Sequence, residues 1–195
     1  MLALRNIKIT FQDYESEKWF EKVLNEWTPR TNTIIYIPCA SKKPFHKAPS
    51  HKSRRKFRVF WDLWIKDLID LIIVSEPLTV VPAEFDYPVP IYPIYDYPVK
   101  LIKGNNHFAE KERNIWRQRF EKFARKHSDK ECFFLLYPYH RKILGDILEK
   151  YCKAGLYVER PCIPMGTSYL LRIIEDKSFG IFKVISQKEC RRNSF

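Results

Sequence analysis

Cysteine pairs of the CxxC type are missing from this chain, although it contains five cysteines. Without such pairs we do not expect a zinc knuckle. The odd number and irregular spacing of the cysteines argue against a disulfide framework and favour reduced thiols. The sequence also lacks a signal peptide and any apolar run long enough to span a membrane, so we expect a cytoplasmic protein with no membrane partner.

Acidic residues are absent between Glu26 and Asp62, and this acid-free window holds nine lysines and arginines, eight of them from Lys42 to Arg58. The whole chain carries a net charge of +12. Charges packed at this density repel one another unless an external anion such as a phosphate neutralises them. The alternative is a solvated, salt-screened surface. We expect the following basic residues to contact nucleic acid: Lys42, Lys47, Lys52, Arg54 and Arg55.

Apolar, β-branched runs alternate with amphipathic helical patterns along the chain. We predict strands over 33–38, 71–77, 131–138, 169–174 and 180–185, and helices over 14–27, 56–70, 107–127 and 139–153. This alternation predicts an α/β fold, a three-layer sandwich with a mainly parallel central sheet. The 195 residues fit one domain spanning 1–195 with a flexible tail over 186–195.

Three loops follow predicted strands, and they contain the least common residue combinations in the chain. They cover 38–51, the proline-rich 75–98, and 137–141. In a parallel sheet, loops after strands gather at the carboxyl edge, where ligand sites form. We therefore expect 38–51 and 75–98 to lie side by side.

The first of these loops reads PCASKKPFHKAPSH and places Cys39 directly after a strand. Nearby lysines and a following helix start predict a lowered pKa for the Cys39 thiol and a reactive thiolate. A small buried residue packed under the loop is an equal alternative. His51 offers an acid, a base or a phosphate contact, and a capping or surface histidine is again the alternative.

The second loop carries carboxylates and tyrosines. Glu84 and Asp96 face the basic loop across the predicted sheet edge, where they either act on an amine as bases or pair with lysines. The tyrosines either stack a flipped base or pack the loop itself.

These loops resemble a known family. PCASKKPFHKAPSH is similar to the Pro-Cys-x3-Lys-Pro-Tyr-x2-Ser-x2-His signature of archaeosine synthase, the archaeal paralogue of tRNA-guanine transglycosylase. Phe45 replaces the signature tyrosine and Ala48 the serine. SEPLTVVPAEFDYPVPIYPIYDYPV resembles a second block of that family, with Glu76 inserted and Thr79 in place of a glycine. The resemblance is strongest over 33–100.

The resemblance implies an archaeal tRNA-processing protein, equivalent to the isolated core domain of archaeosine synthase, with a fold like that of uracil-DNA glycosylases. The family adds an amine donor to the nitrile of 7-cyano-7-deazaguanine in tRNA, in archaeosine biosynthesis. Its full-length members also carry a transglycosylase-like barrel and an RNA-binding module, for which this chain is too short. A transglycosylase-like or radical-enzyme partner subunit is then expected beside tRNA.

The resemblance and the residue chemistry together suggest a site. A thiolate of Cys39 adds to the nitrile carbon, Lys43 and His51 stabilise the developing nitrogen anion, and a carboxylate handles the amine. The predicted catalytic residues are Cys39, Lys43, His51, Glu84 and Asp96. The predicted substrate pocket is lined by Pro38, Pro44, Phe45, Ser75 and Tyr95. No metal and no cofactor is required. The alternative function is a non-catalytic tRNA-binding subunit, and a base-excision glycosylase ranks below both.

Overall fold

The structure is a computed structural model that describes residues 7–155 except 53–56, 94, 98–99 and 153. The predicted strands over 169–174 and 180–185 and the predicted tail lie outside the described residues. So do Arg54, Arg55, Cys162 and Cys190.

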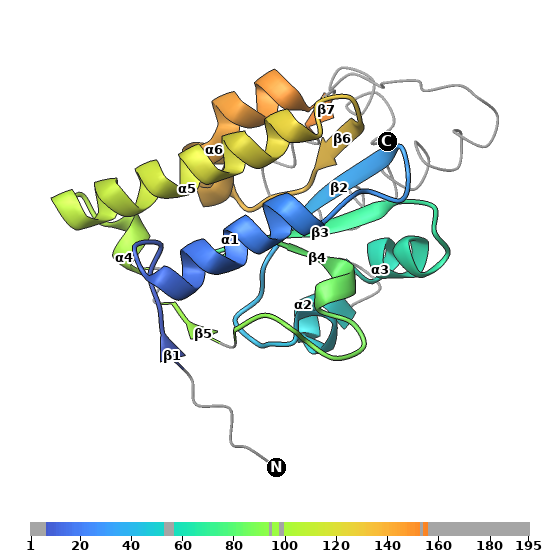
Figure 1. Cartoon of the computed structure of the whole chain (residues 1–195), viewed down its shortest axis with the longest axis horizontal. Coiled ribbons are helices and arrows are strands. Elements are labelled where there is room, and N and C mark those ends of the chain that lie inside the picture. Colours follow the sequence, from blue (N-terminus) through green and yellow to red (C-terminus); the bar gives the residue numbers. More distant parts are fainter. Residues whose placement is uncertain (1–6, 53–56, 94, 98–99, 153, 156–195) are drawn as a thin grey trace, which may run out of the picture.

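Helices and strands alternate along most of the described chain (Figure 1). The strands are β1 (Ile7–Lys8), β2 (Thr33–Pro38), β3 (Asp70–Ser75), β4 (Thr79–Pro82), β5 (Tyr95–Asp96), β6 (Glu131–Phe134) and β7 (Ala154–Gly155). The α-helices are α1 (Tyr14–Glu26), α2 (Pro49–Lys52), α3 (Arg58–Ile65), α4 (Lys100–Lys103), α5 (His107–Lys126) and α6 (Pro138–Tyr151). Short 3-10 turns lie at η1 (Phe45–Lys47) and η2 (Ala83–Phe85).

The main sheet of the described residues has five strands in the order β4-β3-β2-β6-β7. β2 pairs in parallel with both β3 and β6, and β6 pairs in parallel with β7. Only β4 runs antiparallel, because a short turn connects it directly to β3. The prediction of an α/β fold with a mainly parallel sheet is confirmed.

The antiparallel strand β4 was not predicted as a strand. Its residues open the proline-rich segment, which we expected to be an irregular loop or a set of extended edges. Pro82, at the end of β4, is tolerated there because β4 lies at the edge of the sheet, where a missing backbone donor disrupts no inner ladder. The predicted helix over 56–70 is also shorter than expected and ends at Ile65.

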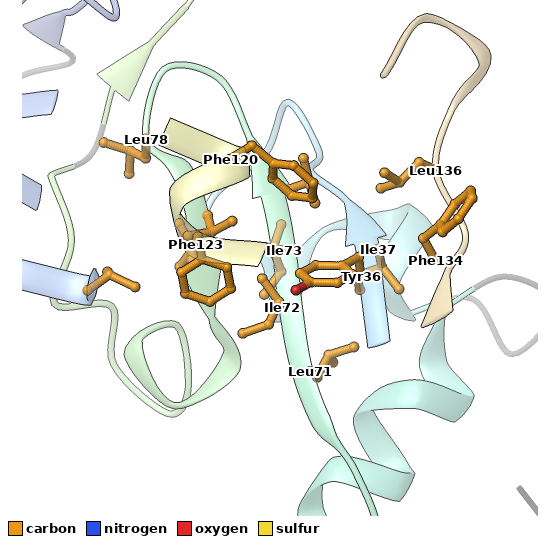
Figure 2. Packing of buried hydrophobic residues seen from close by; sticks show 14 of the residues in the cluster. Tyr36, Ile37, Leu71, Ile72, Ile73, Leu78, Phe120, Phe123, Phe134 and Leu136 are labelled. Carbon is orange, nitrogen blue, oxygen red and sulfur yellow. The ribbon is translucent and has the colours of Figure 1, made fainter. Parts of the chain in front are cut away.

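The sheet is buried on both faces. All six residues of β2 are buried, as are all six of β3, which explains their continuous apolar sequence. Figure 1 shows α1, α5 and α6 on one side of the sheet and α2 and α3 on the other. Figure 2 shows Phe120 and Phe123 of α5 near Tyr36 of β2, and the Phe120 and Tyr36 ring centroids lie 5.5 Å apart.

Within the described part of the chain, every helix falls short of the length or the apolar character that crossing a membrane demands.

Candidate functional site

The loops after β2, β3 and β6 meet at the carboxyl edge of the sheet. Pro38 is the register partner of Val74, and the backbone N–H of Cys39 donates a hydrogen bond to the Val74 carbonyl at 2.9 Å. Cys39 and Ser75 therefore end neighbouring strands at the same edge, as predicted. β6 is parallel to β2, so the first turn of α6 also begins there.

A cavity of about 420 Å³ opens between these loops. Its walls come from the strand ends, the loop after β2 and the segment around β5. The lining residues are Cys39, Ala40, Ser41, Lys42, Lys43, Ala48, Pro49, Ser50, Glu76, Tyr95, Asp96, Tyr97, Tyr137 and Tyr139. Four tyrosines and two lysines in this lining combine flat apolar surfaces with positive charge, a suitable environment for a planar, polar ligand attached to phosphates.

The chemical centre of the cavity is a thiol beside a buried carboxylate. Sγ of Cys39 donates a hydrogen bond to Oε2 of Glu76 at 3.2 Å. Oη of Tyr139 donates to Oε1 of Glu76 at 2.5 Å. Nε2 of His140 lies 3.3 Å from the same Oε1 atom. Glu76 is 3% exposed, so these neighbours take the place of water around its charge.

The prediction of a lowered pKa for Cys39 is wrong, whereas its reactivity stays a prediction. Burial and the negative charge of Glu76 raise the pKa of Cys39 well above its usual value, and the opposing charge of Lys43 is too weak to reverse this. Glu76, which was not predicted as a neighbour of Cys39, is the cause of this difference together with burial. Cys39 is therefore a neutral thiol at rest.

Glu76 is the ionised partner of this thiol. Burial alone would raise the pKa of Glu76, but His140, Tyr139 and Cys39 together lower it. The carboxylate thus stays charged and remains a hydrogen-bond acceptor for the thiol. Sequence reasoning missed Glu76, Tyr139 and His140 as site residues, although all three lie in the loops singled out after the strands.

Lys43 is placed as predicted, at the wall of the cavity. Its Nζ atom lies 4.1 Å from the ring centroid of Tyr95, a cation–π contact. Burial lowers the pKa of Lys43, while the nearby Cys39, Asp96 and Glu76 side chains oppose that shift. A lysine in this environment releases its proton more readily than an exposed lysine.

Asp96, a predicted catalytic residue, and Tyr95, a predicted pocket residue, also line the cavity. The predicted catalytic residues Glu84 and His51 do not. Asp96 is exposed at the rim. Glu84 instead accepts a hydrogen bond from Nε1 of Trp27 and lies outside the cavity lining. The assignment of Glu84 to the site is therefore not supported.

His51 lies beneath the cavity rather than in it. Its side chain is fully buried, Nε2 donates to the Pro38 carbonyl at 3.0 Å, and Nδ1 accepts from Nε1 of Trp61 at 3.3 Å. Burial lowers the pKa of His51 to about 4, despite the bond to the carbonyl. Both ring nitrogens are engaged and the ring is neutral, so His51 supports the loop and is not available as an acid or a base.

The predicted pocket residues mostly form the layer under the cavity. Pro38 ends β2 and is buried, as is Phe45, whose ring stacks on Tyr92 with centroids 5.6 Å apart. Pro44 is partly buried, and Ser75 is buried and hydrogen-bonded to Tyr95. Of the predicted pocket residues, only Tyr95 belongs to the cavity lining.

Asp86 fixes the loop after β2 to the segment after β4. This fully buried carboxylate accepts hydrogen bonds from the backbone N–H groups of Phe45 and His46, both at 2.8 Å. It also accepts one from Oη of Tyr92 at 2.5 Å and pairs with Nδ1 of His46 at 2.7 Å. Asp86 therefore holds in place the loop that carries Cys39 and Lys43.

The predicted nucleic-acid contacts occupy the outer side of the same loop. Lys42, Lys47 and Lys52 are exposed. Of these three, Lys42 also belongs to the cavity lining and places positive charge beside the site. The tRNA contact itself remains a prediction.

The fold and the site define an α/β protein with a mainly parallel sheet and a thiol–carboxylate pair in a cavity at its carboxyl edge. Residues 16–160 match the family described as a domain of unknown function, DUF5591, and the chain belongs to that family. A search of curated proteins finds none that is significantly similar.

One solved structure has a related fold. The crystal structure of AF0587, a protein of unknown function, matches with a TM-score of 0.53 and 20% sequence identity, covering 80% of this chain and 49% of that protein. At this identity the likeness concerns the fold alone. The chain spans about half the length of AF0587.

Proposed function

We propose that this protein adds an amine to the nitrile group of 7-cyano-7-deazaguanine in tRNA and forms an amidine. The observation that carries the proposal is the contact between Cys39 and Glu76 in a cavity flanked by lysines. A nitrile carbon is an electrophile, and a thiol with a base beside it is a suitable nucleophile. The resemblance to archaeosine synthase supplies the identity of the substrate.

The first step joins Cys39 to the substrate. As Sγ bonds to the nitrile carbon, Glu76 takes the thiol proton through the hydrogen bond that already connects them. The nitrile nitrogen receives a proton from the Lys43 ammonium group, whose pKa is lowered. The product is a thioimidate, with Glu76 protonated and Lys43 neutral.

The second step releases the enzyme. The amine donor attacks the thioimidate carbon and gives a proton to neutral Lys43. The Cys39 sulfur leaves and recovers its proton from Glu76. The sum of the two steps is the addition of one amine across one nitrile, so no oxidant or reductant is consumed.

We infer a three-layer sandwich related to the uracil-DNA glycosylase-like fold, supported by helices on both sides of the sheet (Figure 1). tRNA is the polyanion that the acid-free window contacts, in a cytoplasmic setting. A transglycosylase-like or radical-enzyme subunit supplies further tRNA contacts.

A second candidate function is a non-catalytic, tRNA-binding subunit of a modifying complex. The observation that favours it is the raised pKa of Cys39, which leaves little thiolate at neutral pH. The two functions differ in whether Cys39 is needed for chemistry or only for packing.

The test uses the purified full chain, tRNA that carries the cyano-deazaguanine, and lysine or glutamine as amine donor. Mass spectrometry of the digested nucleosides should show the amidine adduct with the native protein. Cys39→Ser should abolish the adduct, whereas Cys152→Ser, a matched thiol loss away from the cavity, should not. Full activity of Cys39→Ser would eliminate the covalent mechanism, and tRNA binding without any adduct would favour the subunit function.

A further inference from the structure

Three side chains of the types that bind metals converge at the cavity, where Cys39 and Glu76 line the wall and His140 lies behind Glu76. Cys39 follows β2, Glu76 follows β3, and His140 lies in the first turn of α6. Their ligand atoms, a sulfur, a carboxylate oxygen and a ring nitrogen, all lie within 4.8 Å of one another. The sequence places them 37 and 64 residues apart, so only the parallel sheet brings them together.

His140 provides an independent sign that a ligand is expected here. Its side chain is fully buried, and neither ring nitrogen has a hydrogen-bond partner of regular geometry among the described residues. The ring is held by packing, with the Tyr139 ring centroid 4.1 Å away and the Trp116 centroid 5.4 Å away. Nε2 has one polar neighbour, Oε1 of Glu76 at 3.3 Å, and Nδ1 has none among the described residues. Nε2 therefore points to the carboxylate, where a bound metal would share both groups as ligands.

The donor set selects the type of ion. Sulfur, imidazole nitrogen and carboxylate oxygen together favour Zn²⁺ over Mg²⁺ or Ca²⁺, which prefer oxygen donors alone. Bonds of zinc to these atoms are about 2.0–2.3 Å long, so neighbouring ligands of a tetrahedral ion lie about 3.5 Å apart. The distances of 3.2 Å from Sγ to Oε2 and 3.3 Å from Nε2 to Oε1 require only small adjustments.

Charge and orientation also suit a divalent cation. A Cys39 thiolate and the Glu76 carboxylate together neutralise two positive charges. Tyr139 donates a hydrogen bond to Glu76, the kind of outer contact that orients a metal ligand. Lys43 is the nearby opposing charge, and its Nζ atom lies over the Tyr95 ring.

We propose that Cys39, Glu76 and His140 bind one Zn²⁺ ion whose fourth coordination position faces the cavity. On binding, the Cys39 thiol loses its proton to solvent and a sulfur–zinc bond forms. Zinc withdraws the sulfur electrons that would add to a nitrile, so bound zinc should inhibit the covalent reaction. Only this inhibition rests on the proposed function; the binding site does not.

The test is a titration of the full chain with Zn²⁺ against a chromophoric chelator, in a Cys162→Ser, Cys190→Ser background. We expect one ion per chain. Cys39→Ser and Glu76→Gln should each weaken binding by at least about tenfold, since even outer contacts contribute about 10- to 100-fold. Cys152→Ser and Glu84→Gln should leave the affinity unchanged. With Co²⁺ as the probe, a sulfur-to-metal charge-transfer band should appear in the native site and vanish in Cys39→Ser.

The outcomes separate the zinc site from the proposed reaction. Absence of zinc binding, or equal affinity in Cys39→Ser and Glu76→Gln variants that circular dichroism shows to be folded, overturns the zinc site. Zinc binding by a chain that forms no amidine even after a chelator has removed the zinc supports the site and counts against the reaction alone. Amidine formation that added zinc suppresses and a chelator restores supports both. Amidine formation by a chain that binds no zinc overturns only the zinc site.

Discussion

The Sγ atom of Cys39 lies 3.2 Å from Oε2 of Glu76, at the ends of two neighbouring parallel strands. This contact reverses the chemistry that the cationic loop suggests. Nearby lysines would favour a thiolate, but burial and a single buried carboxylate outweigh them and keep the proton on sulfur. At rest the site therefore holds a protonated Cys39 thiol beside the Glu76 carboxylate, which can accept its proton. It does not hold Cys39 as a thiolate.

Glu76→Gln should separate thiol ionisation from catalysis. Removing the negative charge lowers the pKa of Cys39, so iodoacetamide should alkylate Cys39 faster at pH 8 than in the native chain. The proposed amidine formation should nevertheless fall, because the base is lost. Mass spectrometry of alkylated peptides and of tRNA nucleosides measures the two effects, with Glu84→Gln as the control. Slower alkylation in Glu76→Gln would contradict the assigned role of the carboxylate.

Much of the edge of the sheet was predictable, because buried strands read as continuous apolar runs and parallel strands place their following loops together. The pairing of Cys39 with Glu76 was not predictable, because the contact joins residues 37 positions apart and depends on the register of Pro38 with Val74. His51 illustrates the same limit. Its ring is buried and accepts a hydrogen bond from Trp61, a contact that sequence spacing alone does not indicate.

Asp86→Ala should destabilise the protein strongly. The change leaves the buried N–H of Phe45, the N–H of His46 and the Tyr92 hydroxyl without their acceptor. An unsatisfied buried donor costs about 1–3 kcal/mol, so a total loss of about 3 kcal/mol or more is expected. Urea unfolding measures this loss. Asp62→Ala, which removes an exposed partner of Arg58, should change stability little. A small effect of Asp86→Ala would show that water replaces the missing carboxylate.

Thr79→Gly should stabilise the fold. Thr79 has a φ of 69°, in the left-handed region, where a side chain costs about 1–2 kcal/mol. Its buried hydroxyl also has no hydrogen-bond partner among the described residues. Glycine relieves both costs. It also makes the unfolded chain more flexible, which lowers the free energy of unfolding by about 1 kcal/mol. A net increase of about 1 kcal/mol in the free energy of unfolding is therefore expected. Thr79→Ala, which keeps the strained Cβ, should gain less in the same unfolding assay. Equal gains would place the cost in the hydroxyl rather than in the backbone.

Replacing Lys42, Lys47 and Lys52 with glutamine should weaken tRNA binding and reduce its dependence on salt. Each lost phosphate contact lowers the slope of log affinity against log salt by about 0.7–0.9. A matched variant changes Lys22, Lys122 and Lys150, which lie on helices outside the acid-free window and pair with glutamates. Filter binding at several salt concentrations compares the two. Equal slopes in both variants would mean that the window is an ordinary solvated surface.

His51 should make the protein sensitive to acid. Its pKa is about 4 in the folded chain and 6.5 as the ordinary value, so between these pH values the unfolded state binds the proton and the folded state does not. The stability is therefore fully present above pH 6.5 and is lost as the pH falls toward 4. This difference in proton binding by His51, over two pH units, lowers the free energy of unfolding by about 3 kcal/mol. Urea unfolding at pH 7 and pH 4.5 should show a smaller loss for His51→Gln than for the native chain, whereas His107→Gln, at an exposed position, should match the native loss. Carboxylates titrate in all three proteins, so the difference in lost unfolding free energy between His51→Gln and the native chain reports on His51 alone. Identical losses in these two proteins would mean that the folded protein accepts the proton on His51.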